Sequence, residues 1–208
     1  LCDRRQRQMC IRDRYYNEAA AILKSMPGLK IIGITGSYGK TSTKHYLNRI
    51  LQEHFSTTMT PGSFNTTLGV IRTIREHLQP YNEVFIVEMG TKQPGDIKEI
   101  CDLVHPSMGI ITAVGEQHLE SFKSIENVQR TKFELADALP ADGTVVVNND
   151  FPYVASRAVE NTGCIRYGVS DTDKADMVAG DIAYTPSGTT FTVSGPLLES
   201  PMTLHTKL

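Results

Sequence analysis

Residues 34–41, ITGSYGKT, are the stretch of sequence that decides the fold. The stretch resembles the Walker A pattern G-x-x-x-x-G-K-[ST], but Ile34 stands where the first glycine belongs. The apolar run 29–35 predicts a buried strand before the glycines, and apolar residues at helical spacing over 40–55 predict a helix after them. A strand, a glycine turn and a helix are the context that a phosphate-binding loop requires. We therefore expect this segment to bind phosphate rather than to be an ordinary turn.

The residue types of this loop indicate what it binds. Backbone N–H groups of a glycine turn, at the positive end of a helix, form an anion site. Lys40 adds a cation for β- and γ-phosphates, and the hydroxyl of Thr41 can bind Mg²⁺. The predicted nucleotide-binding residues are Gly36, Ser37, Tyr38, Gly39, Lys40, Thr41 and Ser42.

Segments that predict strands alternate with segments that predict helices along most of the chain. Helices are expected over 15–26, 68–78, 94–104 and 124–139, the last capped by Ser124, and further strands over 56–60, 83–90, 107–114 and 143–150. This alternation predicts an α/β fold, a mostly parallel sheet with helices on both faces. After about residue 170, a hairpin signal at 186–188 and alternating residues over 202–206 predict a small antiparallel sheet appended to the core.

Both ends of the chain have an unusual composition. Residues 1–14, LCDRRQRQMCIRDR, are dense in arginine, lack an initiator Met and show neither helical nor strand periodicity. They resemble translated sequencing-adaptor DNA, and the alternative is a disordered basic tail. We expect residues 1–14 to be non-native and exclude them from functional reasoning. The other end stops within a strand-like alternation, which indicates a fragment.

Composition excludes several classes of protein. The 208 residues are 40% hydrophobic and carry a net charge of −2, which gives no global electrostatic case for binding nucleic acid or an anionic membrane. No apolar run approaches the length of a membrane span, and no secretory signal is present. The four cysteines form no C-x-x-C pair, which favours a reducing compartment. We expect a cytoplasmic protein.

Other polar residues follow the predicted strands. Glu88 ends the strand 83–90, and His118 lies in the loop after the strand 107–114. Because the carboxyl ends of parallel strands share one edge of a sheet, both should lie near Thr41. Each alone could simply face solvent. Lys132 on the helix 124–139 would ordinarily be a solvated lysine, and residues 65–67 could be only a turn and helix cap.

Taken in order, these segments resemble a known family, the Mur ligases. TGSYGKT is similar to their shortened phosphate loop T-G-[ST]-x-G-K-T, and PGSFNTTLGV, VFIVEMG, EQHLESF and RTKFELADALPADGTVVVNND follow with the family's order and spacing. The resemblance covers about residues 30–208. It implies that residues 15–208 are a truncated central ATP-binding domain of these ligases. The chain looks most like the branch that adds D-alanyl-D-alanine to a UDP-muramoyl tripeptide in peptidoglycan synthesis.

The resemblance implies an acyl-phosphate mechanism. ATP would phosphorylate a substrate carboxylate, and an amine would displace the phosphate. Lys40 would hold the β- and γ-phosphates, Thr41 and Glu88 one Mg²⁺, and His118 a second Mg²⁺. Lys132 matches the family's lysine that is commonly carbamylated by CO₂, and its carbamate would support the second ion. Asn65 and Thr66 match the loop that faces the UDP-linked substrate. The catalytic residues implied are thus Lys40, His118 and Lys132.

The sequence also departs from the family pattern. It stops before the G-x-H-N-x-x-N segment and lacks the amino- and carboxyl-terminal domains, so we expect the chain alone to be an inactive, monomeric fragment. Alternatives are a folylpolyglutamate synthase, which shares the loop, and a nucleotide-binding partner module without ligase activity. A generic P-loop NTPase is disfavoured by the displaced glycine.

Overall fold

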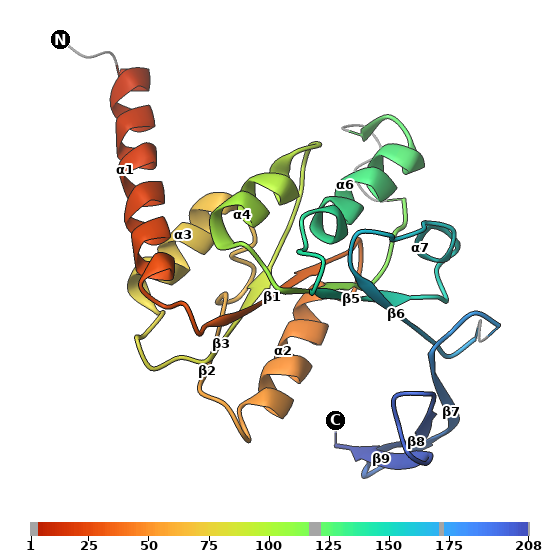
Figure 1. The fold of residues 1–208 in the computed structure, drawn as a ribbon. Helices are drawn as coiled ribbons and strands as arrows, with labels where there is room; N and C mark the ends of the chain where they lie inside the picture. The colour runs from red at the N-terminus through yellow and green to blue at the C-terminus, as the bar shows by residue number, and fades with distance from the viewer. Residues whose placement is uncertain (1–3, 117–121, 171–172, 208) are drawn as a thin grey trace.

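The computed structural model describes residues 4–116, 122–170 and 173–207. The described helices are α1 (Arg4–Lys24), α2 (Lys40–Leu51), α3 (Thr67–Glu76), α4 (Asp96–Val104), α6 (Ile125–Asp137) and α7 (Pro152–Ala155). The described strands are β1 (Lys30–Thr35), β2 (Thr57–Met59), β3 (Val84–Glu88), β4 (Met108–Ile111), β5 (Thr144–Asn148), β6 (Gly163–Gly168), β7 (Met177–Thr185), β8 (Gly188–Ser194) and β9 (Met202–Thr206). Figure 1 shows their arrangement.

In the described part of the chain, the strands form one mixed sheet in the order β2-β3-β1-β4-β5-β6-β7-β8-β9. Pairing is parallel from β2 to β7 and antiparallel from β7 to β9. Strand β1 lies between β3 and β4, with Ile34 opposite Glu88 and Thr35 opposite Ile111. The loops that follow these three strands therefore meet at one edge of the sheet, where ligands bind in open α/β folds.

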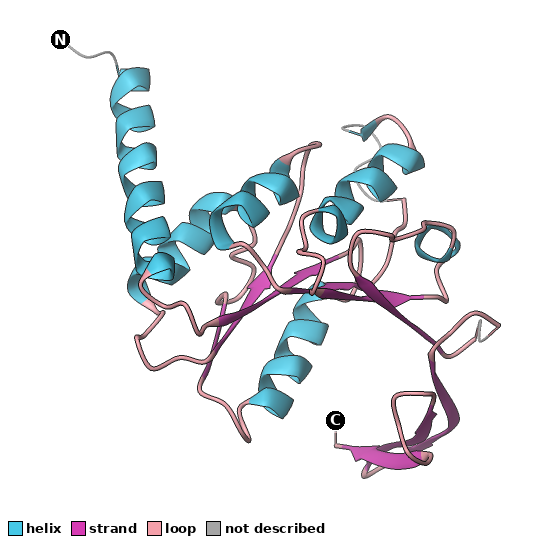
Figure 2. Cartoon of the chain, viewed as in Figure 1, coloured by secondary structure: helices cyan, strands magenta, loops and turns pink. Residues whose placement is uncertain are grey.

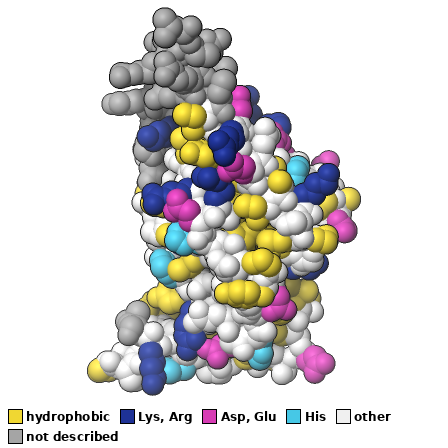
Figure 3. Space-filling model, turned by 90° about the vertical axis from the view of Figure 1, so that its left-hand side faces the viewer, with side chains coloured by type: hydrophobic (Ala, Val, Ile, Leu, Met, Phe, Trp, Pro, Cys, Tyr) yellow, Lys and Arg dark blue, Asp and Glu magenta, His cyan; other side chains and the backbone are white. Residues whose placement is uncertain are grey.

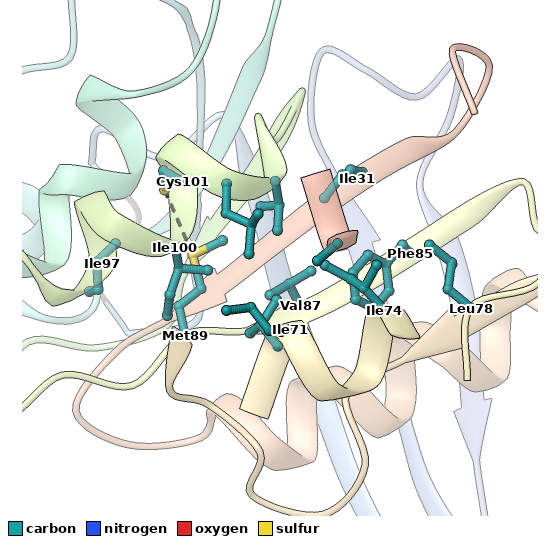
Figure 4. Packing of buried hydrophobic residues seen from close by; sticks show 14 of the residues in the cluster. Ile31, Ile71, Ile74, Leu78, Phe85, Val87, Met89, Ile97, Ile100 and Cys101 are labelled. Carbon is teal, nitrogen blue, oxygen red and sulfur yellow. Dashed lines mark hydrogen bonds between the residues drawn. The ribbon is translucent and has the colours of Figure 1, made fainter. Parts of the chain in front are cut away.

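Helices cover both faces of the parallel part of the sheet, as the sequence predicts (Figure 2). One face carries α1, α3, α4, α6 and α7 over two apolar clusters, and the other carries α2 over a smaller one. Figure 4 shows part of the largest cluster, in which Met89 and Cys101 lie with their sulfur atoms 3.8 Å apart. The α/β fold class is confirmed.

Helix α1 differs from its prediction, because it begins at Arg4 and not at residue 15. The segment has no helical periodicity, but it contains neither glycine nor proline, and its Arg, Gln and Ala residues favour a helix. Among the described side chains of α1, those packed against the core begin at Tyr15. Arg12, before that residue, is paired with Glu99 of α4.

The carboxyl-terminal strands also differ from their prediction in one respect. They are antiparallel, as expected, but they continue the main sheet instead of forming a separate one. Strand β7 joins β6 through two residue pairs, Tyr167 with Met177 and Gly168 with Val178. Helix α7 and strand β6 were not predicted, because neither has a clear apolar period in the sequence.

The polarity of the surface agrees with the near-neutral composition. On the face that carries α1 and α3, basic and acidic side chains are interspersed with apolar ones (Figure 3). Arg75 of α3, for example, pairs with Glu18 of α1 at 2.9 Å. No helix among the described residues combines the length and the apolarity that crossing a membrane demands.

Candidate functional site

The loop between β1 and α2 has a backbone that only glycine fits at its first turn. Gly36 has φ of 150°, and a Cβ placed on it would lie 2.0 Å from the Oγ1 of Thr112. The N–H of Ser37 donates to the carbonyl of Ala113 at 2.8 Å, and the hydroxyl of Thr112 donates to the carbonyl of Tyr38 at 2.5 Å. The loop is thus held against the segment after β4, and Gly36 is the glycine that this contact demands.

The loop ends at the amino terminus of α2, where the first N–H groups of the helix have no partner within the helix. Gly39 occupies the N-cap position with φ of 79°, and it offers no side-chain cap. The first N–H groups of a helix without a cap are available to an anion, and the helix dipole favours negative charge there. This geometry suits a phosphate group.

Lys40 folds back over the loop that precedes it. Its Nζ donates to the carbonyl of Gly36 at 2.7 Å. Burial lowers the pKa of Lys40, while the negative charge of Glu88 acts in the opposite direction. Since these carbonyl contacts are weak substitutes for a phosphate, the ammonium group is well placed to exchange them for phosphate oxygens.

Glu88, at the carboxyl end of β3, is the centre of a buried polar cluster. Its side chain is 1% exposed. Oε2 accepts from the hydroxyl of Thr41 at 3.1 Å and lies 3.0 Å from Nζ of Lys44, and Oε1 accepts from Nδ2 of Asn65 at 3.2 Å. Burial alone would raise the pKa of Glu88, but hydrogen bonds from Lys44, Asn65 and Thr41 and the charge of Lys44 outweigh it and lower the pKa. Glu88 is therefore ionised.

The loop before α3 approaches this cluster closely. The N–H of Gly90 donates to the carbonyl of Asn65 at 2.7 Å, and a Cβ on Gly90 would lie 2.6 Å from Cγ of Asn65. Thr66 is the N-cap of α3, and its hydroxyl accepts from the N–H of Gly69 at 3.3 Å. The helix-cap interpretation of this segment is thus correct for Thr66, while Asn65 contacts Glu88.

Lys132 of α6 is buried rather than solvated, with 3% of its surface exposed. Burial, and then the nearby charge of Lys40, lower its pKa to about 7. A lysine that the fold buries and whose pKa is lowered this far is unusual in proteins, and it points to a functional role.

A cavity of about 440 Å³ joins these groups. Its wall includes Lys40, Asn65, Thr66 and Lys132, together with Thr91. Of the residues singled out in the sequence, four therefore line one cavity, and Thr41 and Glu88 lie next to it through their bonds with each other and with Asn65. Ser37 lies in the loop, where its Oγ accepts from the N–H of Gly115 at 3.1 Å, and Tyr38 is about half exposed. His118 lies outside the described residues.

One site residue was missed from the sequence. Lys44 is fully buried and paired with Glu88. From the sequence alone, a lysine in a helix with polar neighbours is expected to face solvent. The available signal was its place four residues after Lys40, one helical turn along the same face of α2.

The oxygen atoms of Thr41 and Glu88 are suitable for a magnesium ion. Mg²⁺ prefers oxygen ligands and commonly takes only one or two protein groups, with phosphate oxygens and water completing its coordination. Among the described residues there is no cluster of three or more His, Cys, Asp or Glu side chains. The hydroxyl of Thr41 and the ionised carboxylate of Glu88 fit a site in which phosphate oxygens and water supply the other ligands of the ion.

Comparisons with known proteins agree with this geometry. The family model of the Mur ligase middle domain matches residues 34–208. UDP-N-acetylmuramoyl-tripeptide--D-alanyl-D-alanine ligase from Mycobacterium bovis is 39% identical over 160 residues, which are 75% of this chain and 30% of that protein. The chain thus spans about a third of the length of this relative.

Two solved structures share the fold closely. MurF from Acinetobacter baumannii superposes with a TM-score of 0.84 at 25% identity, covering 95% of this chain and 42% of that one. MurF from Thermotoga maritima in complex with ADP superposes with a TM-score of 0.83 at 27% identity, covering 93% and 44%. The match to the middle-domain model extends over most of the sequence, and the chain therefore belongs to the Mur ligase family.

Proposed function

We propose that the complete protein is an ATP-dependent ligase that adds D-alanyl-D-alanine to a UDP-muramoyl tripeptide in peptidoglycan synthesis. The observation that carries this proposal is the convergence of the phosphate loop, the Thr41–Glu88 pair and the buried Lys132 on one cavity. A module that only binds nucleotide would need the loop but not a buried lysine across the cavity. The name of the relative at 39% identity supports the choice of substrates.

ATP is the proposed nucleotide. Support comes from the unpaired N–H groups at the start of α2, from Lys40, and from the ADP named for the Thermotoga maritima structure. Lys40 would leave the carbonyl of Gly36 and bind the β- and γ-phosphates, while the amides from Tyr38 to Ser42 would hold the phosphate chain. Ser37 would shape the loop, because its N–H already donates to the carbonyl of Ala113. Tyr38 would contribute its backbone, since its ring is half exposed.

Thr41 and Glu88 are the proposed ligands of one Mg²⁺. Bound there, the ion would neutralise charge on the phosphate oxygens of ATP. Glu88 is already ionised by its hydrogen bonds, so it needs no deprotonation before it binds a cation. His118 and a modified Lys132 are the proposed ligands of a second ion, and the family resemblance alone supports His118.

Lys132 is the proposed site of carbamylation. A neutral lysine amine adds to CO₂ through its nitrogen and loses one proton, which yields an anionic carbamate. Burial already lowers the pKa of Lys132 to about 7, and this favours the neutral amine. Replacement by alanine should abolish ligase activity, and short carboxylates added to Lys132→Ala should restore part of it. Full activity of that variant without added carboxylate would contradict the proposal.

The proposed reaction has two chemical steps. An oxygen of the tripeptide carboxylate attacks the γ-phosphorus of ATP, the bond from that phosphorus to the β-bridging oxygen breaks, and ADP leaves. The amine of D-alanyl-D-alanine then attacks the acyl carbon, phosphate departs with the former carboxylate oxygen, and the amine loses a proton. Asn65 and Thr66 line the cavity beside Lys40 and would position the acceptor carboxylate.

The organisation of the complete protein is also a proposal. Residues 15–208 would be its central domain, flanked by domains for the UDP-linked substrate and for closure over ATP, and residues 1–14 would be foreign to it. The start of core packing at Tyr15 supports that boundary. We further propose that the enzyme is cytoplasmic, because its UDP-linked substrate and ATP are cytoplasmic compounds, and that it is a monomer.

The direct test is product formation by the full-length protein. With ATP, Mg²⁺, UDP-muramoyl tripeptide and D-alanyl-D-alanine, mass spectrometry should detect the pentapeptide product, and Lys40→Met should abolish it. Lys98→Met is the matched control, because Lys98 is exposed on α4 and pairs with Asp102 away from the cavity. Product formed only from folate and glutamate would instead identify a folylpolyglutamate synthase, and ATP binding without any product would identify a partner module.

A further inference from the structure

Lys44 is a buried charge that none of the proposed roles uses. It lies in α2 one turn after Lys40, and none of its surface is exposed. An ammonium group in the interior is costly unless it is paired and hydrogen-bonded. Lys44 meets both conditions, since its Nζ lies 3.0 Å from Oε2 of Glu88 and also donates to the carbonyl of Gly62.

These two bonds join segments that are distant in the sequence. Gly62 belongs to the loop between β2 and α3, and the same loop supplies Asn65, whose Nδ2 donates to the other oxygen of Glu88. Thr60 binds β3 as well, because its Oγ1 accepts from the N–H of Glu88 at 3.0 Å. The side chains of Thr60 and Asn65 therefore attach the segment 60–65 to Glu88, and Lys44 attaches it to the phosphate-loop helix.

We propose that Lys44 is a positioning residue that ties the segment 60–65 to the phosphate-loop helix through Glu88, and so holds Asn65 at the wall of the cavity. Lys44 does not touch the reacting groups in this arrangement. Its importance for catalysis rests on the proposed function, because only then does the segment hold a substrate beside the nucleotide.

Lys44→Met separates this role from simple filling of the core. Methionine retains most of the side-chain volume and removes the ammonium group. The single variant leaves Glu88 buried without its counter-charge, which can unfold the chain. The double variant Lys44→Met/Glu88→Gln removes both charges and keeps the volume, so it is the decisive one. Lys98→Met again serves as the control for loss of a lysine.

Hydrogen exchange of the unliganded 208-residue chain gives a readout independent of activity. The N–H groups of Thr60, Phe64 and Asn65 donate to the carbonyls of Ile86, Pro61 and Ser63, so their exchange reports on the segment. In the double variant these amides should exchange about tenfold faster or more, while amides of β5 change by less than about twofold. Lys98→Met should leave both regions unchanged.

The two proposals fail in different ways. Exchange of the segment 60–65 within about twofold of wild type in the folded double variant would overturn the role of Lys44. MgADP binding to the full-length protein is measured in parallel by calorimetry. Absence of that binding would contradict the proposed function, while accelerated exchange in the double variant would still support the attachment by the Lys44–Glu88 pair.

Discussion

Replacement of Gly36 by alanine tests the geometry of the phosphate loop most severely. The backbone of Gly36 has φ of 150°, a conformation that residues with a side chain rarely adopt. The new Cβ would also lie 2.0 Å from Oγ1 of Thr112 and 2.9 Å from the backbone nitrogen of Ala113. Both distances are far below van der Waals contact, so the loop must move away from the segment after β4.

The expected cost follows from these two effects. Backbone strain of this kind costs about 1–3 kcal/mol, and overpacking costs about 1–3 kcal/mol more, so the free energy of unfolding should fall by about 2–6 kcal/mol. Gly39→Ala should cost only about 1–2 kcal/mol, because φ is 79° but the nearest atom to its Cβ is 3.8 Å away. Gly28→Ala is the control, since nothing lies within 4 Å of its Cβ, and its effect should stay within about 0.5 kcal/mol.

Urea unfolding of the three variants measures this order directly. Calorimetric titration with MgADP should show the same order, with binding weakened by more than about tenfold in Gly36→Ala. Equal stability and equal MgADP affinity of Gly36→Ala and Gly28→Ala would refute the reasoning, because the close approach of Thr112 to Gly36 would then have no consequence.

Three further predictions concern the charges and the cap. Glu88→Gln leaves the ammonium group of Lys44 buried without its counter-charge, so urea unfolding should show a loss of about 3–5 kcal/mol; a loss below about 1 kcal/mol would contradict the buried pair. Burial lowers the pKa of Lys132 to about 7, whereas in the unfolded chain the amine keeps its proton up to a pH of about 10.5. Between these two pH values the unfolded chain binds one proton more, so the free energy of unfolding should rise by up to about 1.4 kcal/mol per pH unit. In CO₂-free buffer Lys132→Met should lack this rise, and an identical pH slope would exclude a depressed pKa. Ser124→Ala removes the acceptor for the N–H of Asn127 and should cost about 1 kcal/mol in thermal unfolding, whereas no change would show that the cap contributes nothing.

The sequence predicts the parallel core well because its signals there are local. The strands around residues 34, 86, 110 and 146 are short apolar runs between turn residues, and α6 begins after Ser124, whose hydroxyl accepts from the N–H of Asn127 as expected. The glycine spacing of the loop likewise specifies a particular turn. Gly36 is needed for its φ and for the close approach of Thr112, and the position of Ile34 needs no glycine because it lies within β1.

The rest depends on contacts between distant segments. Helical spacing in α2 suggests that Tyr46 and Ile50 pack inward, but 56% and 67% of their surfaces are exposed, while the charged Lys44 is buried. No local pattern reveals that Glu88, at the end of another strand, is its partner. The same holds for Lys132, which is polar in sequence and buried in the fold because α6 places it at the same cavity as Lys40.

The measurement that tests the proposed function most directly follows an oxygen atom. The full-length protein is given ATP, Mg²⁺, D-alanyl-D-alanine and a UDP-muramoyl tripeptide whose acceptor carboxylate carries ¹⁸O at both oxygens. If this carboxylate is phosphorylated, each phosphate released with the amide product contains one ¹⁸O atom, and Lys40→Met releases none. Phosphate without ¹⁸O would contradict the acyl-phosphate route and the assignment of this cavity to the acceptor carboxylate.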